Sequence, residues 1–218
     1  RLLYREWFVH FRFPGAEHVK TVDCVPEGWT ETNVGSITDF LSRGITPKYD
    51  EDGESIVINQ KCIRGSKLSL ELSRKQSKKI PEAKLVQFGD VLINSTGAGT
   101  LGRVAQCQIE RNNLTIDSHV TIARPAKGIP YLWFGLLFFS MENHITTMGR
   151  GATNQTELSR NDLAELKVYL PHSSVLAEFE QVVAPIISQI STLSEQSLQL
   201  VKARDLLLPR LMDGRLEI

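Results

Sequence analysis

Residues 92–102, LINSTGAGTLG, decide between two very different folds. The three glycines have the Gly-x-Gly-x-x-Gly spacing of a dinucleotide-binding turn, and Asp117 follows at the spacing of that motif's ribose-binding acid. Such a turn must open a helix, because the pyrophosphate binds at the helix N-terminus. Residues 103–109, RVAQCQI, instead show the period-two alternation of a strand. The sequence therefore predicts a tight turn between strands and no dinucleotide site.

Short β-like runs separated by turn residues surround this stretch and favour a strand-rich domain. An apolar run at residues 130–141 is too short for the ~20 residues that cross a bilayer, so it predicts a buried helix and no membrane span. Together these patterns predict an α+β fold with a curled, mostly antiparallel sheet. We expect strands at residues 55–59, 84–88, 90–94, 103–109, 114–116, 119–123 and 166–170.

From residue 173 to about 208 the sequence has no glycine and a single proline, Pro185. Apolar residues recur at alternating steps of three and four, which predicts one long coiled-coil helix of ~48 Å. A helix docked on its own domain is the alternative, but such helices usually run about 8–20 residues. We therefore expect a partner helix, from a longer chain or from a second copy. The expected partner-facing residues are Leu176, Phe179, Val183, Ile186, Ile190, Leu193, Leu200 and Leu207.

Composition leaves the partner open but indicates the compartment. The 218 residues include 25 basic and 25 acidic ones, so the net charge is zero and local charge must decide. Cys24, Cys62 and Cys107 are widely spaced, which supports neither a disulfide framework nor a zinc knuckle. These features predict a cytoplasmic protein without a metal site.

Motifs of enzymes are missing. The sequence contains no P-loop Gly-Lys-Ser/Thr, no His-Glu-x-x-His, no Gly-x-Ser-x-Gly and no Asn-Pro-Pro-aromatic motif of an amino-methyltransferase. The pairs Glu82–Lys84 and Glu165–Lys167 match the Glu-x-Lys of metal-dependent nucleases, but roughly one such match is expected by chance. Neither pair has a convincing aspartate partner on a neighbouring strand. We expect no active site.

Local charge stands out between Lys61 and Lys84, where basic residues are opposed only by Glu71 and Glu82. Such a stretch fits contacts to phosphates, although a solvated surface loop is the alternative. The loop-like segment at residues 149–156, GRGATNQT, carries arginine, asparagine and glutamine, which read guanine and adenine edges. Both segments are candidates for contact with nucleic acid.

Several stretches, in order along nearly the whole chain, resemble the DNA-specificity (S) subunits of type I restriction–modification enzymes. Residues 5–14, REWFVHFRFP, resemble the exit of that family's central conserved helix. The other matching stretches are residues 25–29 (VPEGW), 44–47 (GITP), 88–93 (FGDVLI) with the glycine turn, 151–158 (GATNQTEL), 166–171 (LKVYLP), 179–183 (FEQVV) and 204–214 (RDLLLPRLMDG).

The resemblance implies duplex DNA recognition without catalysis. Such subunits carry two target-recognition domains that two antiparallel helices hold apart. They dock adenine-N6 methyltransferase subunits, which bring S-adenosylmethionine, and through them the restriction subunits. This chain would hold the end of a conserved helix at residues 1–13, one recognition domain at 14–171, and a spacer or dimerisation helix with its tail at 172–218. It would be half of a longer subunit, or a half-length subunit whose homodimer reads a palindromic split site.

The candidate site residues combine the resemblance with the charge pattern. A protein-interaction scaffold without specific DNA binding is the competing interpretation, and an unrecognised nuclease or methyltransferase is a further one. The candidate DNA contacts are Lys48, Lys61, Arg64, Lys67, Arg74, Lys75, Lys78, Lys79, Ser95, Thr96, Gly97, Arg103, Arg150, Thr153, Asn154 and Gln155.

Overall fold

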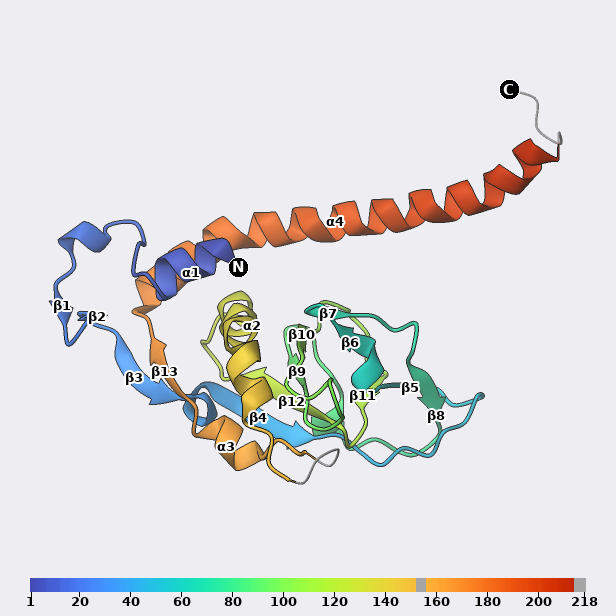
Figure 1. The fold of residues 1–218 in the computed structure, drawn as a ribbon, viewed down its shortest axis with the longest axis horizontal. Coiled ribbons are helices and arrows are strands. Elements are labelled where there is room, and N and C mark those ends of the chain that lie inside the picture. Colours follow the sequence, from blue (N-terminus) through green and yellow to red (C-terminus); the bar gives the residue numbers. More distant parts are fainter. Residues whose placement is uncertain (152–155, 214–218) are drawn as a thin grey trace. The chain divides into compact units, whose positions relative to one another are not determined.

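The computed structural model describes residues 1–151 and 156–213, and it divides into two units, Arg1–Leu176 and Ala177–Ile218. The first unit combines short helices with several small sheets, and the second continues a long helix, α4 (Ser173–Met212) (Figure 1). The predicted α+β class with a long C-terminal helix is confirmed.

The central sheet of the first unit is antiparallel and has the strand order β10-β9-β12-β4. Every residue of β9 is buried, as expected for an inner strand between two partners. The outer strand β4 is only half-buried. The bounds are β4 Thr38–Arg43, β9 Val91–Asn94, β10 Val104–Gln106 and β12 Val120–Pro125.

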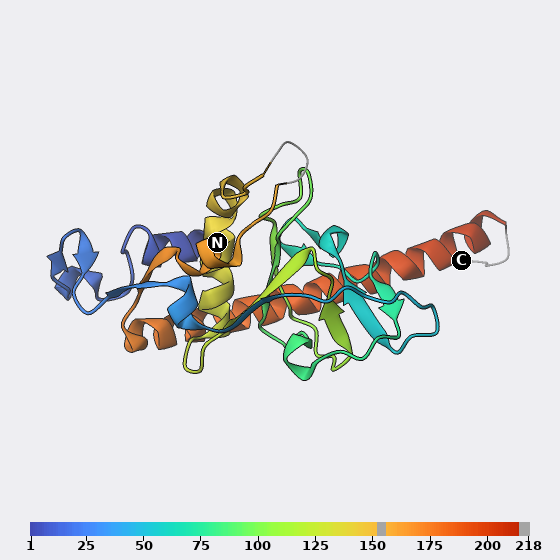
Figure 2. The same ribbon diagram turned by 90° about the horizontal axis from the view of Figure 1, so that it is seen from below.

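A second sheet has the order β11-β5-β8, with β11 (Leu114–Ile116) parallel to β5 (Ser55–Ile58). Its edge strand β8 (Arg74–Gln76) pairs antiparallel with β5. The remaining strands form two-stranded pairs: β1 (Thr21–Val22) with β2 (Val25–Pro26), β3 (Thr30–Asn33) with β13 (Lys167–Leu170), and β6 (Ile63–Arg64) with β7 (Lys67–Leu68). In both views β8 and the β1–β2 hairpin lie at opposite ends of the first unit (Figures 1 and 2).

One core joins the two sheets. Ile58 and Ile116 of the second sheet share an apolar cluster with Leu92 and Ile122 of the central sheet, and all four are fully buried. Burial of this kind contributes about 25 cal/mol per Å² of apolar surface and holds the short strands together. The sheets therefore act as one scaffold for the loops at their ends.

Helix α2 (Tyr131–Thr147) is the buried helix that the apolar run predicted. It packs on β9 and β10, and a Cβ at Gly135 would lie only 2.4 Å from Gln106 Oε1. Helix α1 (Leu2–Phe8) packs on α2, where the Phe8 ring lies 6.3 Å from that of Trp133. The other short elements are α3 (Arg160–Ala164) and the 3-10 turns η1 (Ala16–His18), η2 (Val34–Ile37), η3 (Gln60–Cys62) and η4 (Glu82–Lys84).

Two predicted strands differ from the structure: β10 covers only Val104–Gln106 of the expected residues 103–109, and the other lies at residues 84–88. Residues 84–88 form no strand, because side chains take their backbone groups: Arg124 Nη2 donates to Leu85 O and Asp90 Oδ2 accepts from Gln87 N. Asp90 and Arg124 also form a buried bidentate ion pair, with both hydrogen bonds 2.8 Å long. Helix α4 ends at Met212, directly before the Asp213-Gly214 pair at which the sequence predicts its end, and it contains Pro185 and Pro209.

Candidate nucleic-acid interface

The glycine turn, residues 95–102, connects β9 to β10. It closes by hydrogen bonds from Leu101 N to Gly97 O (3.0 Å) and from Gly102 N to Asn94 O (2.8 Å). β10 then runs back beside β9, so no helix follows the glycines. The prediction of a turn between strands is confirmed, and the geometry of a dinucleotide-binding turn is not present here.

The glycines of this turn are needed for different reasons. All three have positive φ, which L side chains rarely adopt. A Cβ at Gly102 would lie 2.5–2.6 Å from Thr146 of α2, including its backbone, whereas a Cβ at Gly99 would meet nothing within 4 Å. A Cβ at Gly97 would lie 2.4 Å from Thr100 Oγ1. Gly102 therefore allows the turn to pack closely against α2, while Gly99 is needed only for the positive φ of the turn.

Most polar side chains of the glycine turn already have partners. Ser95 is fully buried and its hydroxyl lies 2.5 Å from Thr121 Oγ1, which corrects the expectation that its side chain contacts DNA. Thr96 Oγ1 lies 2.7 Å from Nδ1 of the exposed His119. The Arg103 guanidinium donates across the turn to Gly99 O (2.7 Å). His119, which no sequence motif singled out, thus joins the candidate surface through Thr96.

The structure brings the glycine turn together with the segment that follows α2. Thr96 and Arg150 both form β-bridges with Glu157, and Leu158 N donates to Ser95 O (2.8 Å). Arg43 at the end of β4 forms an ion pair with Glu157. The two candidate segments are therefore neighbours in space, although Thr96 and Glu157 lie 61 residues apart in sequence.

Arg150 itself is 77% exposed and forms an ion pair with Asp162 of α3 (Nε to Oδ2, 2.8 Å). Its guanidinium is held toward the protein rather than left free, so base contact would require this exposed pair to open. The other candidates of this segment, Thr153, Asn154 and Gln155, lie outside the described residues. Their proposed contacts stay predictions.

The basic stretch divides into two groups. The first group, Lys61, Arg64 and Lys67, is exposed on η3 and the β6–β7 hairpin. Asn94 Nδ2 donates to Gln60 O (3.0 Å), and Gln60 also lies beside Gly97, so this hairpin group adjoins the glycine turn. We therefore place the hairpin group on the same surface as the turn.

The second group lies on and after β8, at the edge of the other sheet. We call Arg74, Lys75, Lys78 and Lys79 the β8 edge; all four are exposed. Beside it runs the acidic loop, residues 50–54, with the sequence DEDGE. Asp50 N donates to Lys75 O (3.1 Å), and Ser77 N donates to O of the exposed Lys48 (3.0 Å). The acidic loop places carboxylates next to the basic side chains, which sequence distance had concealed.

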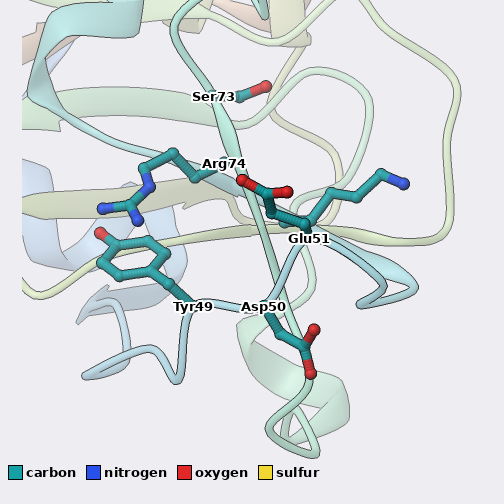
Figure 3. A pocket seen from close by; sticks show the side chains of 6 residues that line it. Tyr49, Asp50, Glu51, Ser73 and Arg74 are labelled. Atoms are coloured by element: carbon teal, nitrogen blue, oxygen red, sulfur yellow. The ribbon is translucent and has the colours of Figure 1, made fainter.

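A pocket of about 340 Å³ opens between the acidic loop and β8. Tyr49, Asp50, Glu51, Ser73, Arg74 and Lys75 line it (Figure 3). The Arg74 guanidinium carbon lies 3.7 Å from the centroid of the Tyr49 ring. Partial burial, with the charge of Asp117 as a lesser cause, raises the pKa of Tyr49 above its ordinary value, while Arg74 opposes the shift. The phenol therefore stays neutral at physiological pH.

The Glu-x-Lys pairs show no sign of a nuclease site. Lys84 Nζ donates to Gly44 O (2.9 Å), and Lys167 pairs with Glu31 on the neighbouring strand (2.6 Å). The hydrogen bond between Lys167 and Glu31 raises the pKa of the lysine and lowers that of the glutamate. In residues 1–151 and 156–213 no group of three or more His, Cys, Asp or Glu is placed to hold a metal ion.

The predicted apolar seam of helix α4 is buried near the start of the helix and exposed farther along it. Leu176, Phe179 and Val183 are buried, whereas the later seam residues Ile186, Ile190, Leu193, Leu200 and Leu207 are exposed, with Ile190 at 52%. Exposed apolar side chains in a continuous stripe are characteristic of a surface that binds a partner. Within the described chain, no helix is long and apolar enough to span a membrane.

Comparison with known proteins gives relatives of one kind. No protein-family model matches the chain. The specificity subunit of type I restriction enzyme MjaIX from Methanocaldococcus jannaschii is 24% identical, over 99% of this chain and 52% of the relative. The specificity subunit of type I restriction enzyme HindI from Haemophilus influenzae is 25% identical, over 88% of this chain and 42% of the relative. The chain thus spans about half the length of the curated relatives that it matches.

Solved structures agree on the fold. The S subunit of a type I restriction–modification system from M. genitalium superposes with a TM-score of 0.58 and 16% identity, over 86% of this chain and 45% of that chain. The HsdS subunit from Thermoanaerobacter tengcongensis gives 0.56 and 20%, over 99% and 50%. The resemblance to type I specificity subunits that the sequence predicted is confirmed.

Proposed function

We propose that this chain recognises a specific duplex DNA sequence as a non-catalytic specificity subunit, or half-subunit, of a type I restriction–modification complex. The observation that carries the proposal is the alignment with such subunits over 99% of the chain. The exposed hairpin group beside the glycine turn supports it, because basic side chains near loops neutralise phosphates. Domain 14–171 would be the recognition domain in this proposal, and residues 172–218 the spacer.

The partners follow from the same proposal. Methyltransferase subunits, which carry S-adenosylmethionine, would modify adenines in the site, and restriction subunits would join through them. The exposed seam of α4 would bind a second long helix, supplied by the other half of a longer subunit or by a second copy. The complex would act in the cytoplasm, where its DNA target lies.

Selection from randomised duplexes tests the function, with the chain alone and then with a methyltransferase partner. We expect enrichment of a short motif. A motif that recurs as an inverted pair at fixed spacing indicates a homodimer, because protein symmetry is mirrored in the half-sites. A single motif indicates half of a longer subunit. If no sequence is enriched in either condition, the DNA-recognition proposal fails and the interaction scaffold replaces it.

The role of the seam has its own test. Ile190→Asp places a charge in the exposed apolar stripe and should abolish association through α4 while leaving the first unit folded. Ser188→Asp, on the opposite side of the same helix, is the control and should associate normally. Sedimentation would report the assembly state. Equal assembly of both variants would contradict a helix partner on this seam.

A further inference from the structure

The pocket between the acidic loop and β8 contains an arginine whose position is fixed but whose hydrogen-bond donors are unused. The Arg74 guanidinium lies over the Tyr49 ring, with its carbon 3.7 Å from the ring centroid (Figure 3). Among the described residues its side chain forms no hydrogen bond or ion pair. Stacking on an aromatic ring restricts the rotamers of arginine before any ligand binds, which lowers the entropy lost on binding.

Tyr49 is well supported in this position. It forms a β-bridge with Gln76, and Ser77 N donates to Lys48 O on the residue before it. Gln76 is fully buried and its side chain exchanges hydrogen bonds with the backbone of Lys78 (2.6 and 2.8 Å). Tyr49 is 40% exposed, so its stacking partner remains at the surface. Tyr49 is therefore a positioning residue for Arg74.

The charges around Arg74 argue against a simple phosphate site. Asp50 and Glu51 line the same pocket, so a phosphate bound beside Arg74 would be repelled by the Glu51 carboxylate and, from farther away, by that of Asp50. Figure 3 shows the Asp50 carboxylate pointing away from Arg74 and the Glu51 carboxylate pointing to the side of the pocket on which Arg74 lies. The pocket thus offers paired N–H donors from one wall and a carboxylate acceptor from another.

A guanine–cytosine base pair has the complementary pattern in the major groove. Guanine presents the acceptors O6 and N7, which an arginine fork contacts bidentately, and cytosine presents the N4 amino donor, which a carboxylate accepts. An adenine–thymine pair also presents both a donor and acceptors, but it lacks the two adjacent acceptors of guanine. The side-chain chemistry of the pocket therefore matches one base pair rather than the DNA backbone.

We propose that Arg74, held by Tyr49, reads the guanine of a G·C pair in the recognised sequence, and that Glu51 accepts from the paired cytosine. This assignment rests on the proposed function and deepens it, since it names a base-reading pair within the recognition domain. It also separates Arg74 from the other basic residues of the stretch, which would contact phosphates.

Duplex selection with the full chain tests the assignment through Arg74→Lys, which keeps the charge and removes the fork. We expect the wild-type motif to contain a G·C pair at one position that Arg74→Lys no longer selects. Discrimination at that position should fall roughly 10- to 100-fold, with the other positions unchanged. Arg64→Lys, in the hairpin group, is the matched control and should preserve the whole motif. Glu51→Ala should weaken selection at the same position only.

Tyrosine variants test the positioning role. Tyr49→Phe keeps the ring and should retain the motif, whereas Tyr49→Leu removes the stacking surface and should reduce selection at the Arg74 position. Thermal unfolding would show that each variant is folded, as expected for exposed side chains. A wild-type motif that Arg74→Lys leaves intact, or an equal loss of affinity on all duplexes, would overturn this assignment alone. Absence of any wild-type motif would overturn the proposed function with it.

Discussion

At the glycine turn nearly every polar side chain already has a partner within the protein, whereas at the β8 edge the arginine is stacked but its donors are unused. Ser95 and Thr96 are bonded to Thr121 and His119, and Arg103 donates across its own turn. The Arg74 guanidinium stacks on the Tyr49 ring and has no hydrogen bond or ion pair with any residue that the structure describes. The difference shows that closeness to a loop does not decide which polar residues can read a ligand. Unused hydrogen-bonding capacity in a fixed position is the better indicator.

The largest effect should come from breaking the packing of the glycine turn. Gly102→Ala places a Cβ within 2.6 Å of Thr146 backbone atoms at a φ of +82°. We expect it to destabilise the fold by roughly 2 to 5 kcal/mol, since strain and overpacking add. Gly99→Ala, at a φ of +71° in open space, should cost only about 1 kcal/mol. Denaturant unfolding measures both, and equal losses would refute the packing role of Gly102.

A smaller stability effect should separate Ser95 from the surface residues. Ser95→Ala leaves the buried Thr121 hydroxyl without its 2.5 Å partner and should cost about 1 to 2 kcal/mol. The slope of DNA affinity against salt should not change, because the side chain is buried. Ser77→Ala, at an exposed position after β8, is the control and should leave stability unchanged. A changed salt slope for Ser95→Ala would return this residue to the interface.

The two basic groups should differ in their salt dependence. Lys61→Ala in the hairpin group should reduce the slope of log affinity against log salt by about 1, the value for one phosphate contact. Lys75→Ala should weaken all duplexes alike but change the slope less, because Asp50 and Glu51 line its pocket. Filter binding across a salt series measures both slopes. Equal slopes would show that the acidic loop does not offset the β8 edge.

The smallest effect concerns Asp117, next to His119. Burial raises the pKa of this carboxyl above its ordinary value, although the hydrogen bond from His119 N opposes the shift. The folded state thus holds the proton more tightly than the unfolded chain does. Its contribution to stability is complete below the ordinary aspartate pKa of about 3.9 and is lost as the pH rises through the raised folded-state value. Asp117→Asn should remove this loss of stability with rising pH. If the pH dependence of unfolding stays the same, Asp117 is not its cause.

Sequence patterns predicted the apolar elements well. The buried helix over residues 130–141 appears as α2, and strands β5, β9, β11, β12 and β13 lie where alternation and turn residues indicated. Hydrophobic periodicity carries this information locally, because it records which face of an element is buried. The heptad pattern likewise predicted α4.

The polar elements were harder to predict for a physical reason. Strand β8 has the sequence RKQ, so its charged side chains resemble a loop; only the pairing with β5 makes it a strand. Charge is common on exposed edge strands, where it opposes aggregation. The acidic loop lies beside β8 through backbone hydrogen bonds between distant residues, which no local pattern records. The structure, and not the sequence pattern, therefore shows that acidic residues lie beside the basic β8 edge and that Arg74 stacks on Tyr49.

The backbone support of the β8 edge has a practical consequence for changing its specificity. Strand β8 is held by main-chain pairing with β5 and with residues 48–50, so the side chains at 51 and 74 are free to vary. A combinatorial library at these two positions should yield variants that select a different base pair while the fold stays intact. Gly53 and Gln76 must be spared, because a Cβ at Gly53 would lie 2.3 Å from Gln76 O. The side chains at positions 51 and 74 can thus be exchanged without changing the backbone that carries them.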